Sequence, residues 1–341
     1  MYSKVFIDDF SGLGAQLTEI LSNMSDDNYL KSVIDQSCRE NSLFTSNMQI
    51  YALLSLCDKF LGRRILKEWL QPYDNMIEER EKTVLIVMAG NIPMVGFHDL
   101  LTTLACGYKA QVKLSSKDRH LIPYLLKLVS DINPYWGERV RFTENLPEVA
   151  DIVIASGSDS TSDYLKTKYA SSHGIIRGSR YSVALLTGNE SCNDLVALAK
   201  DLFLYYGLGC RSVSSLLVPV GYNFSVLLEA FDTMRSEVIS NDYISSYKYQ
   251  KAIYTMSSVG FIDGGFYILG ESGSLPPPLG VINILKYSSM EQVKTFFEEH
   301  HDKLQCVVNY KNGVTFGSTQ NPAIDQYADG INTLDYLLQF V

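Results

Sequence analysis

The sequence predicts an α/β protein in which two doubly wound domains follow a helical N-terminal segment. Three observations carry this prediction. The first 80 residues place apolar side chains at helical spacing, the chain from Thr83 onward alternates strand, turn and helix, and 341 residues suffice for two domains. Repeated βα units form parallel sheets, and ligands bind at the carboxyl ends of their strands.

Residues 1–80 are expected to form helices that cover a sheet. Apolar residues recur every three or four positions from Ile50 to Trp69, and Pro72 closes the run. Nothing in this segment points to chemistry. An amphipathic layer over a sheet is the favoured interpretation, and the lining of a pocket for an apolar substrate is the alternative.

A continuous apolar strand at Thr83–Ala89 opens the first α/β domain and is typical of a parallel sheet that is buried on both faces. The turn Gly90-Asn91-Ile92-Pro93 follows, and then a helix that ends at Gly107. Further strands are expected at Ala110–Leu114, Arg139–Thr143 and Asp151–Ala155.

Polar residues follow three of these strands and mark the candidate ligand-binding edge. They are Asn91, then Lys113 with Ser115 and Ser116, and finally Ser156, Gly157 and Ser158. A Gly-Ser turn at the start of a helix offers backbone N–H groups and the positive end of the helix dipole to a phosphate. The dinucleotide fingerprint GxGxxG is absent, and each turn taken singly is also typical of an ordinary loop.

The second domain is expected to begin after a glycine hinge at Gly178. Its predicted elements are a strand at Tyr181–Leu186, a helix at Asp194–Tyr206, a strand at Ser215–Pro219, a helix at Phe224–Val238, a strand-rich stretch around Gly264-Gly265, a strand at Val281–Leu285 and a helix at Glu291–Glu299. These elements again alternate in the way that predicts βα units.

Cys210 stands at a helix-to-strand corner of this second domain, within LFLYYGLGCRSVSSLLVP (Leu202–Pro219). Gly207 and Gly209 precede the cysteine, so its sulfur is sterically open to a bulky substrate. A thiol in such a turn becomes a nucleophile if nearby charge or backbone N–H groups favour the thiolate. The ordinary alternative for a lone cysteine is a small apolar residue that fills a turn.

Composition argues against several classes of function. The net charge is −9 and the pI is near 5.1, with no basic stripe, so no nucleic-acid partner is expected. The six cysteines form no CxxC pair and no His/Cys cluster, so neither a disulfide framework nor a metal site is expected. The N-terminus is unlike a signal peptide and no apolar run approaches 18 residues, so we expect a cytoplasmic protein without a membrane span.

Six segments resemble, in order, the aldehyde dehydrogenase superfamily. They resemble most closely its fatty-acyl reductase branch, the acyl-CoA and acyl-protein reductases related to the reductase of bacterial bioluminescence. The segments are AGNIPMVGFHDLL, VKLSSKD, IASGSDST, HGIIRGSRYSVALL, YYGLGCRSVSSLLVP and YADGINTLDYLL. They lie within residues 83–341, and an ordered match of six segments is more specific than any one of them.

The resemblance implies a role for individual residues. Cys210 falls on the catalytic thiol, and Asn91 falls on the asparagine whose amide forms an oxyanion hole with the Cys210 backbone N–H. Lys113 falls on the lysine that reaches the adenosine ribose. The cofactor-binding set that the resemblance implies is Lys113, Ser115, Ser116, Ser156, Gly157 and Ser158, and no metal is implied.

The chain also departs from the superfamily pattern near the hinge. Relatives that hydrolyse their thioester carry a glutamate where Ile176 stands here, so the base that activates water is missing. Ser116 replaces the acidic residue that follows the ribose-binding lysine, and this replacement favours NADPH. His173, just before the hinge, is a candidate catalytic proton relay, with a structural histidine as the alternative.

The resemblance therefore implies an NADPH-dependent enzyme that reduces a fatty acyl thioester, acyl-CoA or acyl-protein, to the aldehyde through an acyl-cysteine. The alternatives are a CoA-acylating aldehyde dehydrogenase working oxidatively and a non-catalytic acyl-binding partner in a fatty-acid complex. An acyl-transferring partner enzyme and a homo-oligomer are compatible with this function. The expected domains are the helical segment with the dinucleotide-binding domain at 1–178, the catalytic thiol domain at 179–318, and a C-terminal segment at 319–341 that packs back or enters a dimer interface.

Overall fold

In the computed structural model, which describes residues 2–24, 29–311 and 313–340, the chain divides into two compact units. Unit 1 comprises Met1–Gly178 and Ala323–Val341, and unit 2 comprises Ser179–Pro322. Residues 319–322, which we expected in the C-terminal segment, belong to unit 2. The physical reason is that the buried Asp201 carboxylate accepts hydrogen bonds from both the backbone N–H and the hydroxyl of Thr319.

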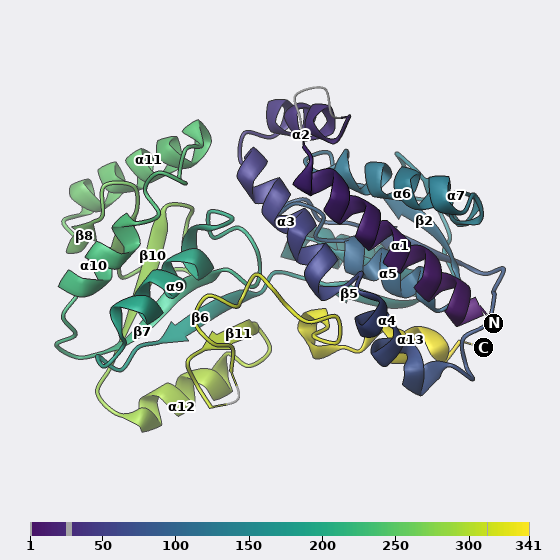
Figure 1. Ribbon diagram of the computed structural model, residues 1–341. Helices are drawn as coiled ribbons and strands as arrows, with labels where there is room; N and C mark the ends of the chain where they lie inside the picture. Colours follow the sequence, from purple (N-terminus) through teal and green to yellow (C-terminus); the bar gives the residue numbers. More distant parts are fainter. Residues whose placement is uncertain (1, 25–28, 312, 341) are drawn as a thin grey trace. The chain divides into compact units, whose positions relative to one another are not determined.

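Unit 1 is a helix-covered parallel sheet (Figure 1). Its helices are α1 (Tyr2–Ser22), α2 (Tyr29–Glu40), α3 (Ser46–Lys59), α4 (Arg63–Leu70), η1 (Gln71–Tyr73), α5 (Phe97–Ala105), α6 (Leu121–Ile132), α7 (Tyr135–Arg139), α8 (Asp159–Lys168), η2 (Ala328–Gly330) and α13 (Thr333–Leu338). Its strands are β1 (Thr83–Val87), β2 (Lys109–Lys113), β3 (Val140–Phe142), β4 (Ile152–Ser156) and β5 (His173–Arg177).

The sheet of unit 1 has the order β3-β2-β1-β4-β5, and each neighbouring pair is parallel. The chain runs outward from β1 through β2 to β3 and then returns to the other side of β1 for β4 and β5. This reversal is the doubly wound topology, with its switch point between β1 and β4. A buried cluster of Leu85, Val87, Val153, Ala155, Leu165 and Tyr169 packs α8 against these two strands.

The N-terminal segment forms helices, as its periodicity predicts, and α1 packs against α3, α4 and α6. Phe6 and Phe10 of α1 are buried, and both lie edge-on to the Trp136 ring of α7. The C-terminal segment is part of the same unit: α13 packs on α5, and the Thr333 hydroxyl accepts a hydrogen bond of 3.0 Å from Arg177. The helices of residues 1–80 thus form a packed layer in unit 1, as in the favoured of the two interpretations.

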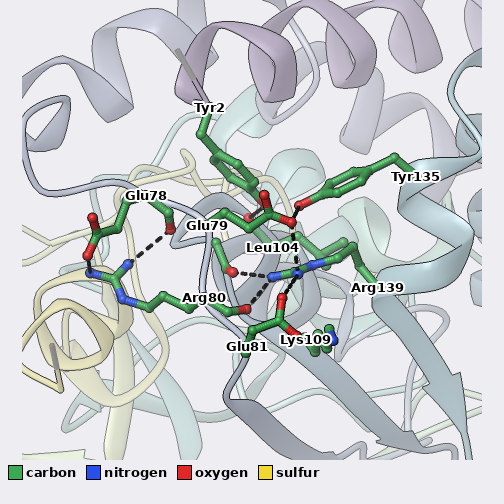
Figure 2. A network of polar contacts seen from close by, with 10 residues as sticks. Tyr2, Glu78, Glu79, Arg80, Glu81, Leu104, Lys109, Tyr135 and Arg139 are labelled. Carbon is green, nitrogen blue, oxygen red and sulfur yellow. Dashed lines mark hydrogen bonds and ion pairs between the residues drawn. The ribbon is translucent and has the colours of Figure 1, made fainter.

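A network of arginines holds the chain where it enters β1 (Figure 2). The Arg139 side chain is 3% exposed and donates to the backbone carbonyls of Arg80 and Gly107 and to the Glu79 carboxylate. Arg80 is also buried and donates to the carbonyls of Cys106 and Met76. Buried backbone carbonyls need such donors, so this network stabilises the amino-terminal edge of the sheet.

Unit 2 is a second α/β unit, with a six-stranded sheet of order β11-β6-β7-β10-β9-β8. Its strands are β6 (Tyr181–Leu185), β7 (Val213–Pro219), β8 (Phe261–Asp263), β9 (Ile268–Gly270), β10 (Val281–Tyr287) and β11 (Leu304–Val308), and its helices are α9 (Cys192–Phe203), α10 (Ser225–Asp232), α11 (Asn241–Ser257) and α12 (Met290–Glu299). The pairs are parallel except for the antiparallel edge strand β8.

Two segments of unit 2 differ from the sequence expectation. The helix expected at Phe224–Val238 ends at Asp232, and tight turns follow. The 17-residue helix α11 was not identified, because tyrosine and serine dominate it and neither is a strong helix former. Its buried face consists of Tyr243, Tyr247 and Tyr254, and the last two pack on β9 and β10.

Within the described residues, no helix combines the length and the apolar character that crossing a bilayer requires. The described part of the chain likewise contains no cluster of three or more His, Cys, Asp or Glu side chains that could hold a metal ion.

Candidate active site

The candidate cofactor residues of unit 1 gather at the carboxyl edge of its sheet. Strands β2, β1 and β4 lie side by side and parallel, so the segments that follow them meet at this edge. Asn91 lies four residues after the end of β1, Lys113 ends β2, and Ser156 ends β4. Asn91 and Ser156 therefore flank the switch point, where doubly wound sheets bind their ligands.

The loop that carries Asn91 rests on the turn that follows β2. A Cβ built on Gly90 would lie 2.5 Å from Ser115 Cβ, so a side chain at position 90 would force the two segments apart. Met94 adopts φ 56°, and its backbone N–H donates a 2.7 Å hydrogen bond to Asp118 Oδ2. A left-handed methionine is strained, and its surroundings must hold it in place.

The turn after β2 presents a lysine. Lys113 is half-buried and, within residues 2–24, 29–311 and 313–340, forms no ion pair. Ser116 and Lys117 are exposed, and Asp118, the carboxylate of this turn, is buried. The exposed part of the turn therefore offers positive charge and hydroxyl groups without a carboxylate, an arrangement that suits a negatively charged ligand.

The turn after β4 is more constrained than its sequence indicates. Arg177 of β5 holds this turn through two hydrogen bonds. Its guanidinium group donates to the Ser156 hydroxyl at 3.4 Å, and its backbone carbonyl accepts the Gly157 N–H at 3.2 Å. The Ser158 hydroxyl caps α8 by accepting the Thr161 N–H. Asp159 places a carboxylate in the first turn of the same helix, and this charge opposes an anion bound directly at the helix end.

In unit 2, Cys210 lies in the turn between α9 and β7 and is half-buried. Tyr206 and Gly207 adopt φ values of 54° and 74°, which end the helix and turn the chain toward the cysteine. The Ser182 hydroxyl donates a 2.8 Å hydrogen bond to the Cys210 carbonyl and accepts the Cys306 N–H at 3.0 Å. A buried serine thus fixes the peptide that carries the thiol.

A second brace holds the same turn from the loop around Thr319. The Asp201 carboxylate accepts the Gly317 N–H, the Thr319 N–H and the Thr319 hydroxyl. The Arg211 Nε then donates to the Thr319 carbonyl at 2.6 Å. The Arg211 side chain is therefore engaged with this loop, a contact that its position next to Cys210 in the sequence did not reveal.

Of the remaining cysteines, Cys38 and Cys57 are half-buried like Cys210, and Cys106 and Cys306 are buried. Burial raises the pKa of the Cys57, Cys106 and Cys306 thiols and so disfavours their thiolates. Cys192 is exposed at the first position of α9. Cys192 is therefore the natural comparison for any reagent that reaches surface thiols.

The structure does not bring His173 to the candidate edge. His173 is the first residue of β5, level with the first residue of β4, so it lies at the amino-terminal edge of the sheet. His173 is exposed, and its ring contacts the Phe340 ring in a tilted arrangement at a centroid distance of 4.5 Å. We expected His173 near the site because it is close in sequence to the hinge at Gly178. The extended strand β5 lies between His173 and the hinge, so His173 is at the opposite edge of the sheet.

Three residues that support the site were not singled out from the sequence: Asp118, Ser182 and Asp201. Each acts through hydrogen bonds to the backbone of a segment distant in the chain. No spacing motif announces such contacts. Asp118 lies inside the matching segment VKLSSKD, which was the one sequence signal available.

The chain resembles known proteins in both sequence and fold. A family model described as acyl-CoA reductase (LuxC) matches residues 27–226. The long-chain acyl-protein thioester reductase of Aliivibrio fischeri is 25% identical over 202 residues, which cover 53% of this chain. The chain spans only 41% of the length of that relative.

Aldehyde dehydrogenases are among the solved structures that resemble the chain. Aldehyde dehydrogenase 21 from Physcomitrella patens, in complex with the product succinate, has a TM-score of 0.67 at 11% identity, covering 99% of this chain and 83% of its own. A NAD-dependent benzaldehyde dehydrogenase from Corynebacterium glutamicum has a TM-score of 0.63 at 11% identity, covering 90% and 76%. The aldehyde-dehydrogenase-like fold that the sequence predicts is therefore confirmed. Because the family model covers more than half of the residues, the chain belongs to the acyl-CoA reductase (LuxC) family.

Proposed function

We propose that this protein reduces a fatty acyl thioester to the aldehyde, with NADPH as reductant and Cys210 as the residue that carries the acyl group. The observation that carries the proposal is the Cys210 turn. A half-buried thiol stands between α9 and β7 on a peptide fixed by the Ser182 hydroxyl. A nucleophilic thiol must be accessible to its substrate and held in a defined position, and the Cys210 turn meets both requirements.

In the first half of the reaction, the Cys210 thiolate attacks the thioester carbonyl. The Sγ–C bond forms, the bond between carbon and the donor sulfur breaks, and the donor leaves as a thiolate. We assign the Asn91 amide and the Cys210 N–H to the oxyanion that develops on the carbonyl oxygen. Removing one oxyanion donor typically costs roughly 10²–10³ in rate.

The residues at the carboxyl edge of unit 1 fit a nicotinamide dinucleotide. Lys113 and the hydroxyls of Ser115 and Ser116 suit the ribose and its 2′-phosphate, because no exposed carboxylate lies in that turn. We assign the turn Ser156-Gly157-Ser158 to the same cofactor. We do not assign a phosphate to the start of α8 itself, because the Asp159 carboxylate lies there. When bound, the reduced nicotinamide supplies the hydride that converts the acyl group to an aldehyde, and Cys210 leaves as a thiolate.

Water is a poor competitor in this scheme. Ile176 is half-buried and packs against the apolar cluster under α8, so position 176 offers no general base. Such a base is worth roughly 10²–10⁴-fold in rate. The acyl-enzyme should therefore persist in water, and a free thiol or the reduced cofactor should discharge it.

The deciding experiment is incubation with a series of acyl-CoA thioesters, without cofactor, followed by peptide mass spectrometry. One acyl group should appear on Cys210. Cys210→Ser should bind substrate and turn over very slowly, because an alkoxide is far harder to form near neutral pH. Cys192→Ser, which removes the exposed thiol, should behave as the wild type.

Labelling at Cys192 in place of Cys210 would reject the assignment. A chain that gains no acyl group from either an acyl-CoA or an acylated protein would be the non-catalytic acyl-binding partner. Adding NADPH to the acyl-enzyme should release free aldehyde. An enzyme that works oxidatively would instead convert aldehyde, NADP⁺ and CoA to acyl-CoA much faster than the reverse reaction.

A further inference from the structure

Asp118 lies where the two site-bearing segments of unit 1 meet. Its side chain is 4% exposed, and its Oδ2 accepts the Met94 N–H at 2.7 Å. Its own backbone N–H donates to the Ser115 carbonyl at 3.2 Å, which closes the turn after β2. One residue thus ties the turn that carries Lys113 to the loop that carries Asn91.

The bond to Met94 acts at the strained point of the Asn91 loop. Met94 has φ 56°, and its carbonyl accepts the Phe97 N–H at 2.9 Å, the residue with which α5 begins. The Asn91 loop therefore has β1 at one end and α5 at the other, with the Asp118 carboxylate between them. Loss of that acceptor would free the backbone to leave the left-handed region.

Asp118 is also a costly choice for a purely structural contact. Across the described residues, its Oδ1 is buried and has no hydrogen-bond partner. Burial raises the pKa of this carboxyl to about 7, because one backbone N–H compensates only part of the lost hydration. The contact with Met94 is thus made at a desolvation cost, and buried polar groups with incomplete hydrogen bonding are found more often at functional sites than at structural ones.

We propose that Asp118 is a positioning residue for the oxyanion hole: its carboxylate holds the loop between Gly90 and Met94 in the one shape that directs the Asn91 amide toward the acyl carbonyl. The inference rests on the proposed function for its catalytic consequence. Displacing a catalytic group by about 1 Å typically costs roughly 10²-fold in rate. Asp118 touches neither substrate nor cofactor in this scheme.

The loop itself is tested first, in the full-length chain and without any ligand. Hydrogen exchange of the backbone amides in residues 88–97, followed by mass spectrometry, should be at least about tenfold faster in Asp118→Ala than in the wild type, because the Met94 N–H loses its acceptor. Asp118→Asn keeps an oxygen in the same place and should exchange within about threefold of the wild type. Equal exchange in Asp118→Ala and the wild type would overturn the proposal.

The catalytic consequence is tested by the rate of acylation of Cys210 with dodecanoyl-CoA. Asp118→Ala should lower this rate by roughly 10²-fold, and Asp118→Asn should restore most of it. Adding Asp118→Ala to Asn91→Ala should lower the rate little further, since both changes remove the same oxyanion contact. The reaction of Cys210 with iodoacetamide needs no oxyanion hole and should keep its wild-type rate in each variant.

A matched variant separates positioning from general loss of stability. Val129→Ala removes two buried methyl groups from α6 of the same unit, away from the candidate edge, and should leave acylation unchanged while lowering stability. Equal loss of acylation in Val129→Ala and Asp118→Ala, or independent effects of Asp118→Ala and Asn91→Ala, would overturn the proposal. Failure of the proposed function is a different result: the wild type would gain no acyl group, whereas the exchange comparison would still decide the loop.

Discussion

The two edges of the unit 1 sheet use the same kinds of charged residues in opposite ways. At the amino-terminal edge, Arg80 and Arg139 are buried. Their guanidinium groups donate hydrogen bonds to backbone carbonyls, and that of Arg139 also to Glu79 (Figure 2). At the carboxyl edge, Asp118 is buried with one hydrogen bond to its side chain, and Lys113 forms no ion pair within the described residues. The arginines of the first edge are therefore engaged within the protein, whereas the lysine of the second edge can still pair with a ligand.

The two lysines of β2 present the same contrast within five residues. Lys109 begins the strand and forms an ion pair with Glu81, with 2.5 Å between Nζ and Oε2. Lys113 ends the strand at the edge that carries Asn91 and Ser156. Among the described residues, buried polar atoms without a partner occur at both edges, at Arg139 Nε and at Asp118 Oδ1, so the contrast rests on the pairing of the two lysines. A lysine without an ion pair at a ligand-binding edge is more typical of a functional site, and the comparison therefore assigns stability to one edge and chemistry to the other.

The largest expected effect is on stability at the amino-terminal edge. Arg139→Met should lower the free energy of unfolding by about 3–5 kcal/mol, because it leaves the buried Arg80 carbonyl without a donor, removes one of the two donors to the Gly107 carbonyl, and removes the ion pair with Glu79. Urea denaturation followed by tryptophan fluorescence measures this loss. Trp69 and Trp136, the two tryptophans of the sequence, both belong to unit 1, so the signal reports this unit.

The matched control is Arg141→Met on the neighbouring strand β3, where the side chain is exposed. Its unfolding curve should be close to that of the wild type. At temperatures where Arg139→Met is folded, Cys210 should be acylated at the wild-type rate. A strong loss of acylation in folded Arg139→Met would contradict the assignment of stability to one edge and chemistry to the other.

The next effect is on chemistry at the carboxyl edge. Asn91→Ala should lower the rate of Cys210 acylation by roughly 10²–10³-fold, because one oxyanion donor is lost, while the unfolding curve changes little. Asn91→Asp tests the same donor at constant shape and should be equally slow. An acylation rate within about threefold of the wild type in both variants would contradict the assignment of Asn91.

The fold and the outline of the site were predictable from the sequence, because their signals are local. The apolar run at Thr83–Ala89 predicts β1, and the alternation after it predicts the parallel sheet that brings Asn91, Lys113 and Ser156 to one edge. The order of strands along the chain was enough for this prediction, because the carboxyl ends of neighbouring parallel strands lie at the same edge of the sheet.

Residues that act through another segment escaped this reasoning. Asp118 and Ser182 contact backbone groups 24 and 28 residues away, and no pattern in the chain encodes such pairs. His173 is the converse case. It is close in sequence to the hinge, but an extended strand of five residues carries it to the far edge. The helix α11 was missed because tyrosines, not leucines, carry its buried face.

A smaller effect concerns the pH dependence of stability. Burial raises the pKa of Asp118 to about 7, while the unfolded chain loses this proton near pH 4. Between these values the folded state holds a proton that the unfolded state has lost, so the Asp118 contribution to stability falls as pH rises and levels off above pH 7. Gly90, Met94 and Ser115 surround the carboxyl without charge, and the flanking Lys117 and Arg119 are exposed.

Asp118→Asn removes this titration. The free energy of unfolding of the variant, minus that of the wild type, should therefore increase by about 2 kcal/mol from pH 5 to pH 7. Urea denaturation at several pH values measures this difference. A difference that is independent of pH would mean that Asp118 is ionised throughout.

The smallest expected effect is on cofactor affinity, and it compares the two lysines of β2 directly. Lys113→Ala should raise the dissociation constant of NADPH by roughly tenfold, the value of one charge-assisted hydrogen bond, and that of NADH by less, because NADH lacks the 2′-phosphate. Lys109→Ala removes the same side chain from the other end of the strand and should leave both constants unchanged, since Lys109 is paired with Glu81. Titration of tryptophan fluorescence measures each constant without turnover. Equal weakening by the two variants would mean that the effect is electrostatic and spread over the unit, and equal affinity of the wild type for NADH and NADPH would remove the 2′-phosphate from the assignment of Lys113.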